Sequence, residues 1–214
     1  GPTSESGSNN RSFSPTTSSV RTVPSMSRVL EGKLTQTNPQ TYEDWQTVSL
    51  VYRILQWGIT VRDRTETSSE TTGQTDQDSK AITVTESAGP FEITSQTTNT
   101  VVWKSGANEL ISWNINNTNL APINTQTVSI YLSTNGGKNF KTLLVSNTLN
   151  DGQYEFIVPP NINATSTRIK IVPDNGIYFA VNKQPFRIIE RPFATSFESV
   201  SKSICDPTSL TYKD

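Results

Sequence analysis

The sequence predicts an all-β protein made of two consecutive antiparallel β-sandwich domains with negligible helix. Short stretches of alternating apolar and polar residues recur about every 8–14 residues, separated by clusters of Gly, Asn, Pro and Asp. This spacing is typical of a sandwich or a barrel. In addition, no window places apolar residues at the 3.6-residue period of an amphipathic helix.

The composition favours small domains with much polar surface. Of the 214 residues, 32% are hydrophobic and 17% are charged, against about 45–50% and about 25% in ordinary globular domains. Ser, Thr and Asn fill roughly a third of the chain. The net charge of -1 argues against binding to nucleic acid or to an anionic membrane.

Several kinds of chemistry are excluded by residues that the chain lacks. It contains no histidine and a single cysteine, Cys205. Without histidine there is no His-ligated zinc site, no His-based triad and no Cys–His nucleophile within this chain. One cysteine cannot form an internal disulfide. No apolar run approaches the ~18–20 residues of a membrane span.

Shifts in composition divide the chain into four parts. Residues 1–23 are interpreted as a flexible arm or a linker left from expression, and 24–89 as a first β-sandwich module. Residues 90–190 form the second module, and 191–214 a linker with the start of a truncated following domain. Pro90 restricts the residue before it, so the segment 88–90 is expected to limit the angle between the modules.

The first module has the less regular pattern. Residues 46–63 are predicted as strand, with a slip of register near Leu55 and Gln56 that suggests a bulge or two strands run together. The polar stretch 64–80 is predicted as a long exposed loop, followed by a strand over 81–85. The short apolar stretch within 25–30 is expected to dock on the β modules.

The second module shows regular alternation. In 127–133, for example, Val128, Ile130 and Leu132 share one face. Strands are predicted at 91–95, 100–104, 109–115, 127–133, 140–145, 153–158, 167–172, 176–180 and 185–190.

The sharpest local motif lies between two of these strands. Asn135 and Gly136 predict a tight hairpin, because such turns need positive φ angles that Asn and Gly tolerate. The stretch 133–140 also resembles the Asp-box of sialidases and other β-repeat proteins, in which it is a structural turn. We therefore assign Asn135, Gly136 and Gly137 a structural role, with ligand contact by Asn135 and Lys138 as the minor alternative.

Three tryptophans are assigned to the interior. Trp113 shares its face with Ile111 and Ile115, and Trp57 continues an apolar alternation. Trp103 follows Val101 with the same parity, which favours the core. An exposed Trp103 would instead offer a stacking platform for a sugar ring, so it is kept as a candidate ligand contact.

Acidic residues give no catalytic or metal site. Asp76, Asp78, Asp151 and Asp174 are expected in turns, and Asp151 with Gly152 is explained by turn chemistry. Such turns sometimes hold Ca²⁺, but the dense ligand spacing is missing here, so calcium is a minor alternative and no cofactor is expected. No pair of acids is nominated for glycoside cleavage.

Two stretches resemble a known family. Residues 57–96 and 103–188 are similar to the tandem Ig-like or fibronectin-like modules of secreted reprolysin-like zinc metallopeptidases of Bacteroidetes. The matching residues are Trp103, Gly106, Trp113, Ala121, Pro122, Ser133, Gly136, Gly137, Phe140, Asn150, Asp151, Gly152, Pro159, Arg168, Ile169 and Lys170. Asn135 departs from the Asp usual in that family.

The resemblance implies a role without catalysis. The family's catalytic domain carries an H-E-x-x-H-x-x-G-x-x-H zinc motif, which no position of this chain can match. The implied modules are Ig-like or fibronectin III-like and lie downstream of a bacterial peptidase in an exported, multidomain protein. Their partners would be the catalytic and following domains of the same polypeptide, or an extracellular protein or glycan.

The sequence thus predicts spacer and interaction modules of a secreted or cell-surface protein, with no nucleic-acid binding and no membrane insertion. A carbohydrate-binding or adhesion module is the alternative, and a role in folding or latency of the peptidase is a third. An enzyme of another type is disfavoured by the missing histidine and the scattered acids.

Overall fold

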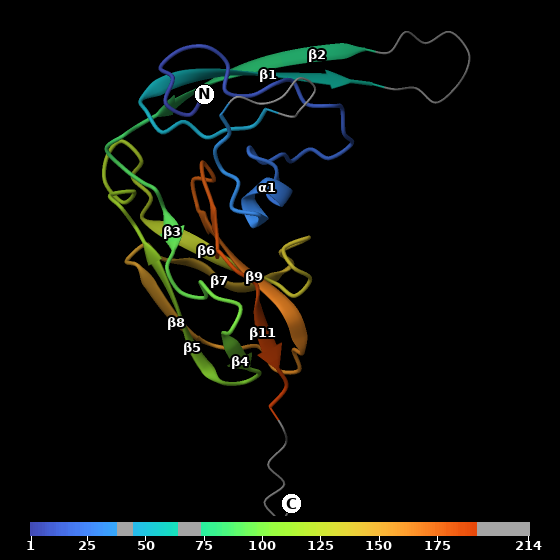
Figure 1. Ribbon diagram of the computed structural model, residues 1–214, viewed down its shortest axis with the longest axis vertical. Coiled ribbons are helices and arrows are strands. Elements are labelled where there is room, and N and C mark those ends of the chain that lie inside the picture. The colour runs from blue at the N-terminus through green and yellow to red at the C-terminus, as the bar shows by residue number, and fades with distance from the viewer. Residues whose placement is uncertain (38–44, 64–73, 192–214) are drawn as a thin grey trace, which may run out of the picture.

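A computed structural model describes residues 1–37, 45–63 and 74–191. The molecule is elongated, with a long two-stranded ribbon at one end and a layered β domain at the other (Figure 1). The tail beyond 191, with Cys205, and residues 64–73 of the predicted loop lie outside the described residues.

Within the described residues there are one short helix and eleven strands. The elements are α1 (Met26–Leu30), β1 (Arg53–Arg62), β2 (Thr75–Val84), β3 (Glu92–Ile93), β4 (Val102–Lys104), β5 (Asn108–Asn114), β6 (Thr127–Ser133), β7 (Thr142–Leu149), β8 (Gln153–Ile157), β9 (Ala164–Pro173), β10 (Ala180–Val181) and β11 (Phe186–Ile189). The all-β prediction is confirmed.

Strands β3 to β11 form two facing sheets. One has the order β3-β5-β8, and the other β4-β11-β9-β6-β7, with β10 added on β9. All neighbouring strands run antiparallel except β4 and β11, which are parallel. The partition of early strands between both sheets, with the last strand beside β4, is the arrangement of an immunoglobulin-like sandwich. The predicted Ig-like class is therefore confirmed, in the sheets formed by β3 to β11.

The core lies between these two sheets. Trp103 of β4 stands edge-on to Phe156 of β8 and Phe186 of β11, with ring centroids 5.3 and 4.4 Å apart. Such aromatic contacts add to the stabilisation from buried area. The buried hydrophobic residues are Ile93, Trp103, Ile111, Trp113, Val128, Ile130, Leu132, Val158, Ala164, Ile169, Ile171, Ala180, Phe186 and Ile188, all within the sandwich.

Each strand predicted for the second module overlaps an observed strand, although the bounds of β3, β4, β7 and β9 differ from their predictions by two to four residues at one end or at both. Strand β6 has the predicted bounds, and the ends of β5 and β8 differ from their predictions by one residue at most. The segment predicted at 176–180 reduces to the two-residue β10. The tight hairpin predicted at Asn135 is wrong, since β6 and β7 are joined by a longer loop over 134–141.

The first module differs from its prediction. The described part of 24–89 contains α1 and the pair β1–β2, rather than two layered sheets. Strand β1 starts at Arg53 and pairs with β2 without interruption, so the slip predicted near Leu55 is wrong. Residues 75–80, predicted as loop, belong to β2, because backbone pairing with an apolar strand extends through a polar sequence.

Candidate functional site

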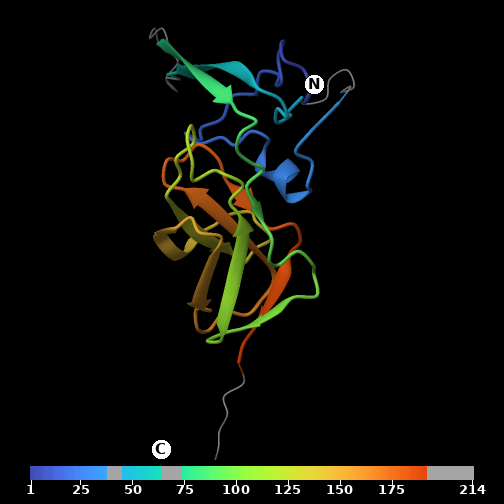
Figure 2. The ribbon, with the colours of Figure 1, turned by 90° about the vertical axis from the view of Figure 1, so that its left-hand side faces the viewer.

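A large hollow separates the ribbon from the sandwich. It is an open space of about 3310 Å³. Its lining comes from β1, part of β2, residues from the first 34, residues 47–49 and 91–93, Lys170 and Val172 of β9, and the sandwich rim from Gly176 to Gln184. Figures 1 and 2 both show the ribbon and the N-terminal segments lying over one end of the sandwich. A drug-sized ligand site measures about 300–1,000 Å³, so the hollow has room for a larger occupant.

The ribbon presents an apolar face to this hollow. Residues paired directly across an antiparallel ladder point to the same side, so Leu55 pairs with Ile82 and Trp57 with Lys80 on one face. Of the β2 residues on that face, Lys80, Ile82 and Val84 line the hollow, whereas Asp76 and Asp78, which pair with Val61 and Ile59, lie outside the lining. Ile59, Val61 and Ile82 are 63%, 65% and 48% exposed. A row of exposed large apolar side chains this dense marks a contact surface.

The ribbon also has two free edges. Strands β1 and β2 form a sheet of two strands, and no backbone hydrogen bond joins residues 53–62 or 75–84 to another element among the described residues. An isolated two-stranded ribbon is at best marginally stable. Its unpaired N–H and C=O groups are a template for a further strand.

The hollow is positively charged although the chain as a whole is not. Eight of its lining side chains are Lys or Arg and three are Glu, which leaves a formal surplus of five positive charges. Two of the acids are engaged, Glu31 with Lys33 at 2.8 Å and Glu92 with Lys183 at 3.9 Å. The basic lining residues are Arg11, Arg21, Lys33, Arg53, Arg62, Lys80, Lys170 and Lys183.

Lys170 of β9 is a half-buried lysine in this lining. Its ammonium lies 4.9 Å from the ring centre of Phe140 and 5.6 Å from that of Tyr131, a cation–π arrangement. Burial lowers the pKa of Lys170 because it disfavours the charged form. Among the described residues no carboxylate lies within ion-pair distance of it.

The N-terminal layer, residues 1–37 and 45–52, forms the other wall of the hollow. The docking predicted for residues 25–30 is confirmed: Arg168 of β9 donates to the backbone oxygens of Leu30 at 3.2 Å and Asn182 at 2.6 Å. Leu30 packs against Gly137, where an added Cβ would overlap the leucine side chain. A guanidinium at the carboxyl end of a helix is favourable, because the last carbonyls are unsatisfied.

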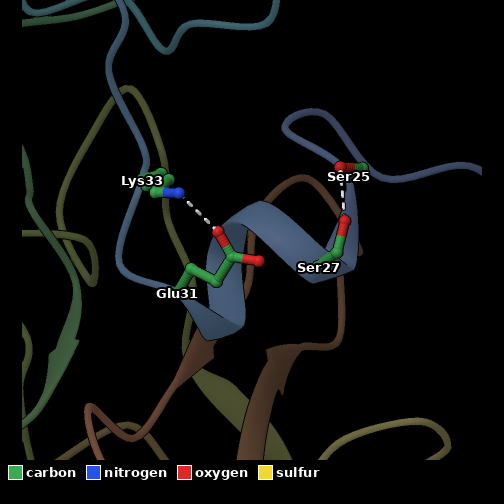
Figure 3. A network of polar contacts seen from close by, with 4 residues as sticks. All are labelled: Ser25, Ser27, Glu31 and Lys33. Carbon is green, nitrogen blue, oxygen red and sulfur yellow. Dashed lines mark hydrogen bonds and ion pairs between the residues drawn. The ribbon is translucent and has the colours of Figure 1, made fainter.

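The segment around α1 is tied by local polar contacts. Ser25 and Ser27 share a hydrogen bond of 3.1 Å at its start, and Lys33 reaches back to Glu31 at its end (Figure 3). The hydrogen bond and charge of Lys33 lower the pKa of Glu31. At 21 residues' separation, the Ser25 N–H donates to the side chain of Gln46 at 2.6 Å.

A second buried arginine joins the start of the chain to the ribbon. Arg53, the first residue of β1, donates to the backbone oxygens of Ser4 and Gly7 and, at 2.8 Å, to the side chain of Asn9. Sequence reasoning missed both Arg53 and Arg168. Arg53 has the parity of the apolar residues Leu55 and Trp57, which is an available signal for burial. Arg168 has the opposite parity to Ile169 and Ile171, the pattern of a solvated face, so the sequence offers no such signal for it.

The predicted ligand contacts are not brought together. Trp103 is 1% exposed in the core, so the stacking platform for a sugar is wrong. Asn135 and Lys138 are exposed in the 134–141 loop, outside the hollow lining. Asn135 accepts hydrogen bonds from Ser133 Oγ at 2.9 Å and from the Asn139 N–H at 3.2 Å, which organises the loop.

The other predicted structural residues have definite places. Trp113 is buried and donates through Nε1 to Asn150, which precedes Asp151 and Gly152. Gly136 and Gly137 have φ angles of 75° and 93°, which glycine tolerates best. Trp57, predicted as buried, is half-buried because it lies on the ribbon face that borders the hollow.

The acids considered for calcium are dispersed. Asp76 and Asp78 lie in β2 rather than in a turn, and each accepts from the N–H of the next residue. Asp151 and Asp174 accept from Gln153 and Ser129. The described residues contain no group of three or more metal-ligating side chains, and none of their helices is long and apolar enough to span a membrane.

Comparisons with known proteins give a weak likeness of structure. A chimeric titin Z1Z2-Z1Z2 tandem carrying a GRGDS peptide from fibronectin superposes with a TM-score of 0.29 and 14% identity, over 55% of this chain and 58% of its own length. A chimeric titin Z1Z2 carrying a KLER peptide from decorin superposes with a TM-score of 0.29 and 7% identity, over 66% of this chain and 82% of its own length. No protein family model and no curated protein matches. The Ig-like assignment above therefore follows from strand order and pairing.

Proposed function

We propose that this chain is a non-catalytic spacer and interaction module of a larger secreted or cell-surface protein. The observation that carries the proposal is the hollow, in which an exposed apolar face, free strand edges and surplus positive charge occur together. The sandwich supports the non-catalytic part, because both of its tryptophans, Trp103 and Trp113, are buried in the core. Its buried arginine, Arg168, donates to backbone carbonyls.

The parent protein is proposed to be a zinc metallopeptidase of the reprolysin-like, bacterial kind. Support comes from the sequence resemblance in residues 103–188. Trp103 and Trp113 of the shared pattern lie in the sandwich core, and Asn150 holds the Trp113 indole. The proposed partners are the catalytic and following domains of the same polypeptide, or an extracellular protein docked in the hollow.

The alternative of a carbohydrate-binding module loses the residue on which it rested, because Trp103 is enclosed by Phe156 and Phe186. Adhesion to another protein is retained, since it uses the same hollow. Calcium in the Asp-containing turns stays a minor proposal without a ligand cluster to support it.

The proposal is tested by deleting residues 24–190 from the parent protein. Cleavage of a short peptide substrate should continue, while cleavage or retention of a protein partner should fall. A parent protein that carries only Trp57→Ser and Ile59→Ser should also show reduced cleavage or retention of a protein partner, while its sandwich stays folded. Turnover by the isolated chain in a peptidase and glycosidase screen, or a deletion without effect on any protein substrate, would contradict it.

A further inference from the structure

We propose that the free edge of β1 accepts an extended segment of another polypeptide as a third strand, with apolar side chains alternating with acidic ones. This proposal rests on the interaction role given above and names the class of partner. Three independent features of the described residues lead to it: the phase of the ladder, the uncovered apolar face and the charge of the hollow.

The phase of the ladder determines which backbone groups are free. The Asp63 N–H donates to Gln74 O at 2.9 Å, which continues the register of β1 and β2 by one pair. In an antiparallel ladder hydrogen-bonded pairs alternate with non-bonded ones. Odd-numbered residues of β1 therefore bond to β2, and the even-numbered ones direct N–H and C=O outward. The outward positions are Ile54, Gln56, Gly58, Thr60 and Arg62.

The edge of β1, rather than that of β2, borders the hollow. All ten residues of β1 line it, on both faces, whereas β2 contributes only Lys80, Ile82 and Val84. A strand added at β1 would lie inside the hollow, and one added at β2 would lie outside it. The even spacing of five outward positions matches an extended segment of about nine or ten residues.

The apolar face selects one row of side chains in the added strand. Trp57, Ile59 and Val61 stand in a line on β1, and Ile59 and Val61 are mostly exposed. A neighbouring strand places every second side chain beside this line, about 5 Å away. Apolar residues in that row would cover the face and widen the ribbon to three strands, which gives independent stability.

The charge of the hollow favours acidic residues in the second row of side chains of the added strand. Arg62 lies on the opposite face of β1, where this second row of side chains would lie, and it has no carboxylate within ion-pair distance among the described residues. Lys170 is in the same situation across the hollow, with its charged form already disfavoured by burial. Acidic side chains near these cations would be attracted, whereas a basic segment would be repelled.

The test uses a nine-residue probe of alternating Val and Glu, labelled with fluorescein and blocked at both ends, added to the full chain. Fluorescence anisotropy should show saturable binding that weakens as salt is raised from about 50 to about 500 mM, because screening acts on the charge contacts. The matched probe of alternating Val and Lys should not bind. A probe of nine Glu residues should bind about tenfold or more weakly, since it lacks the apolar row.

Two variants distinguish the edges. Gly58→Pro removes an outward N–H of β1 while leaving the β1–β2 ladder intact, and proline is tolerated at a strand edge. We expect binding to weaken about tenfold. Ser79→Pro makes the same change at the outer edge of β2 and should leave binding unchanged. Thr60→Pro is the second β1 variant, should Gly58→Pro alter the circular dichroism of the free chain.

Hydrogen exchange gives a readout that needs no variant. The amides of Gly58 and Thr60 should exchange more slowly with the probe bound, and those of Ser79 and Ala81 should not change. Absence of probe binding overturns the proposal, as does protection at Ser79 instead of Gly58. Equal binding of an acidic polysaccharide such as alginate, unaffected by Gly58→Pro, also overturns it. In each of these cases, loss of protein cleavage on deletion of 24–190 would leave the interaction role standing.

Discussion

The sandwich and the N-terminal layer are held together by different kinds of interaction. Every buried hydrophobic residue of the described chain lies between Ile93 and Ile188. Apart from Pro2 and Pro24, the buried side chains of the layer and of the first residue of β1 are polar, namely Asn9, Gln46, Thr47 and Arg53. The sandwich is stabilised by burial of apolar area, and this hydrophobic interaction has no preferred direction. The N-terminal layer depends on hydrogen bonds, which require a defined geometry and contribute about 0.5–1.5 kcal/mol net each.

The two regions also differ in how well their buried polar atoms are satisfied. Among the described residues, eight buried side-chain atoms have no hydrogen-bond partner, and five of them belong to the layer or to Arg53. Unsatisfied buried groups are costly. The layer should therefore open locally at lower free energy than the sandwich unfolds, which suits a wall of a binding hollow.

The largest expected effect is in the sandwich core. Trp103→Ala leaves a cavity against Phe156 and Phe186 and should destabilise the chain by about 3–5 kcal/mol. Urea unfolding followed by circular dichroism measures this change. Trp57→Ala, at the half-buried position on the ribbon, should cost less than about 1 kcal/mol. An equal loss of unfolding free energy in the two variants would contradict the proposed difference between the sandwich and the ribbon.

The next largest effect is expected where α1 of the N-terminal layer contacts the sandwich. Arg168→Leu leaves the backbone oxygens of Leu30 and Asn182 without their charged donor and should cost about 2–3 kcal/mol. Hydrogen exchange should show faster exchange in α1 than in the parent chain, with the sandwich amides retained. The exposed Arg187→Leu on β11 is the control and should have no measurable effect. Unchanged exchange in α1 would show that Arg168 is not what holds it.

A polar contact inside the sandwich gives a smaller change. Asn150 accepts from the Trp113 indole at 2.9 Å and donates to Thr118 and Thr125. Asn150→Ala should cost about 1–3 kcal/mol because buried groups lose their partner. Thermal unfolding would measure it, with the exposed Asn139→Ala as the control. A neutral result would mean that water replaces the amide.

Two glycine variants distinguish the effect of the contact with Leu30 from the effect of backbone strain. Gly137→Ala combines a positive φ with a clash against Leu30, whereas Gly106→Ala has a positive φ of 74° and open space. Gly106→Ala should cost about 1 kcal/mol from strain alone. Gly137→Ala should cost about 1–2 kcal/mol more and loosen α1. Limited proteolysis after Arg28 reports the loosening, and equal behaviour of the two variants would contradict it.

The smallest effect concerns Glu31. Its pKa is lowered by Lys33, so its contribution is present above the unfolded pKa and is lost as pH falls through the folded pKa. Because the Glu31 side chain is exposed to solvent, Lys33→Gln should raise its pKa without a measurable change in the unfolding midpoint. An NMR titration of the Glu31 carboxyl carbon follows the pKa. A shift of the midpoint would show that α1 docking depends on this pair.

The sequence predicted the sandwich well because period-two alternation reports directly on faces that are buried between sheets. Val128, Ile130 and Leu132 have 0%, 0% and 1% exposure, as their spacing required. The ribbon followed a different rule. In β2 a polar stretch from Thr75 pairs with an apolar strand, and polar residues in a strand exposed on both sides leave no pattern.

The site was missed for a related reason. An apolar alternation normally predicts a buried face, so Trp57, Ile59 and Val61 are expected from sequence to be covered within a layered module. The hollow combines residues from the first 34, the ribbon and β9, and no local motif joins segments so distant in sequence. Arg53 and Arg168 bind backbone oxygens, which carry no sequence signal on the acceptor side.

The parallel pairing of β4 with β11 has a mechanical consequence. Tension applied through the chain before β4 and after β11 pulls the two strands in opposite directions along their length. The three pairs from Val102–Arg187 to Lys104–Ile189 would then be loaded together in shear instead of opening one at a time. Trp103, fixed between Phe156 and Phe186 at the middle of that seam, would have to leave the interior before the strands could slide.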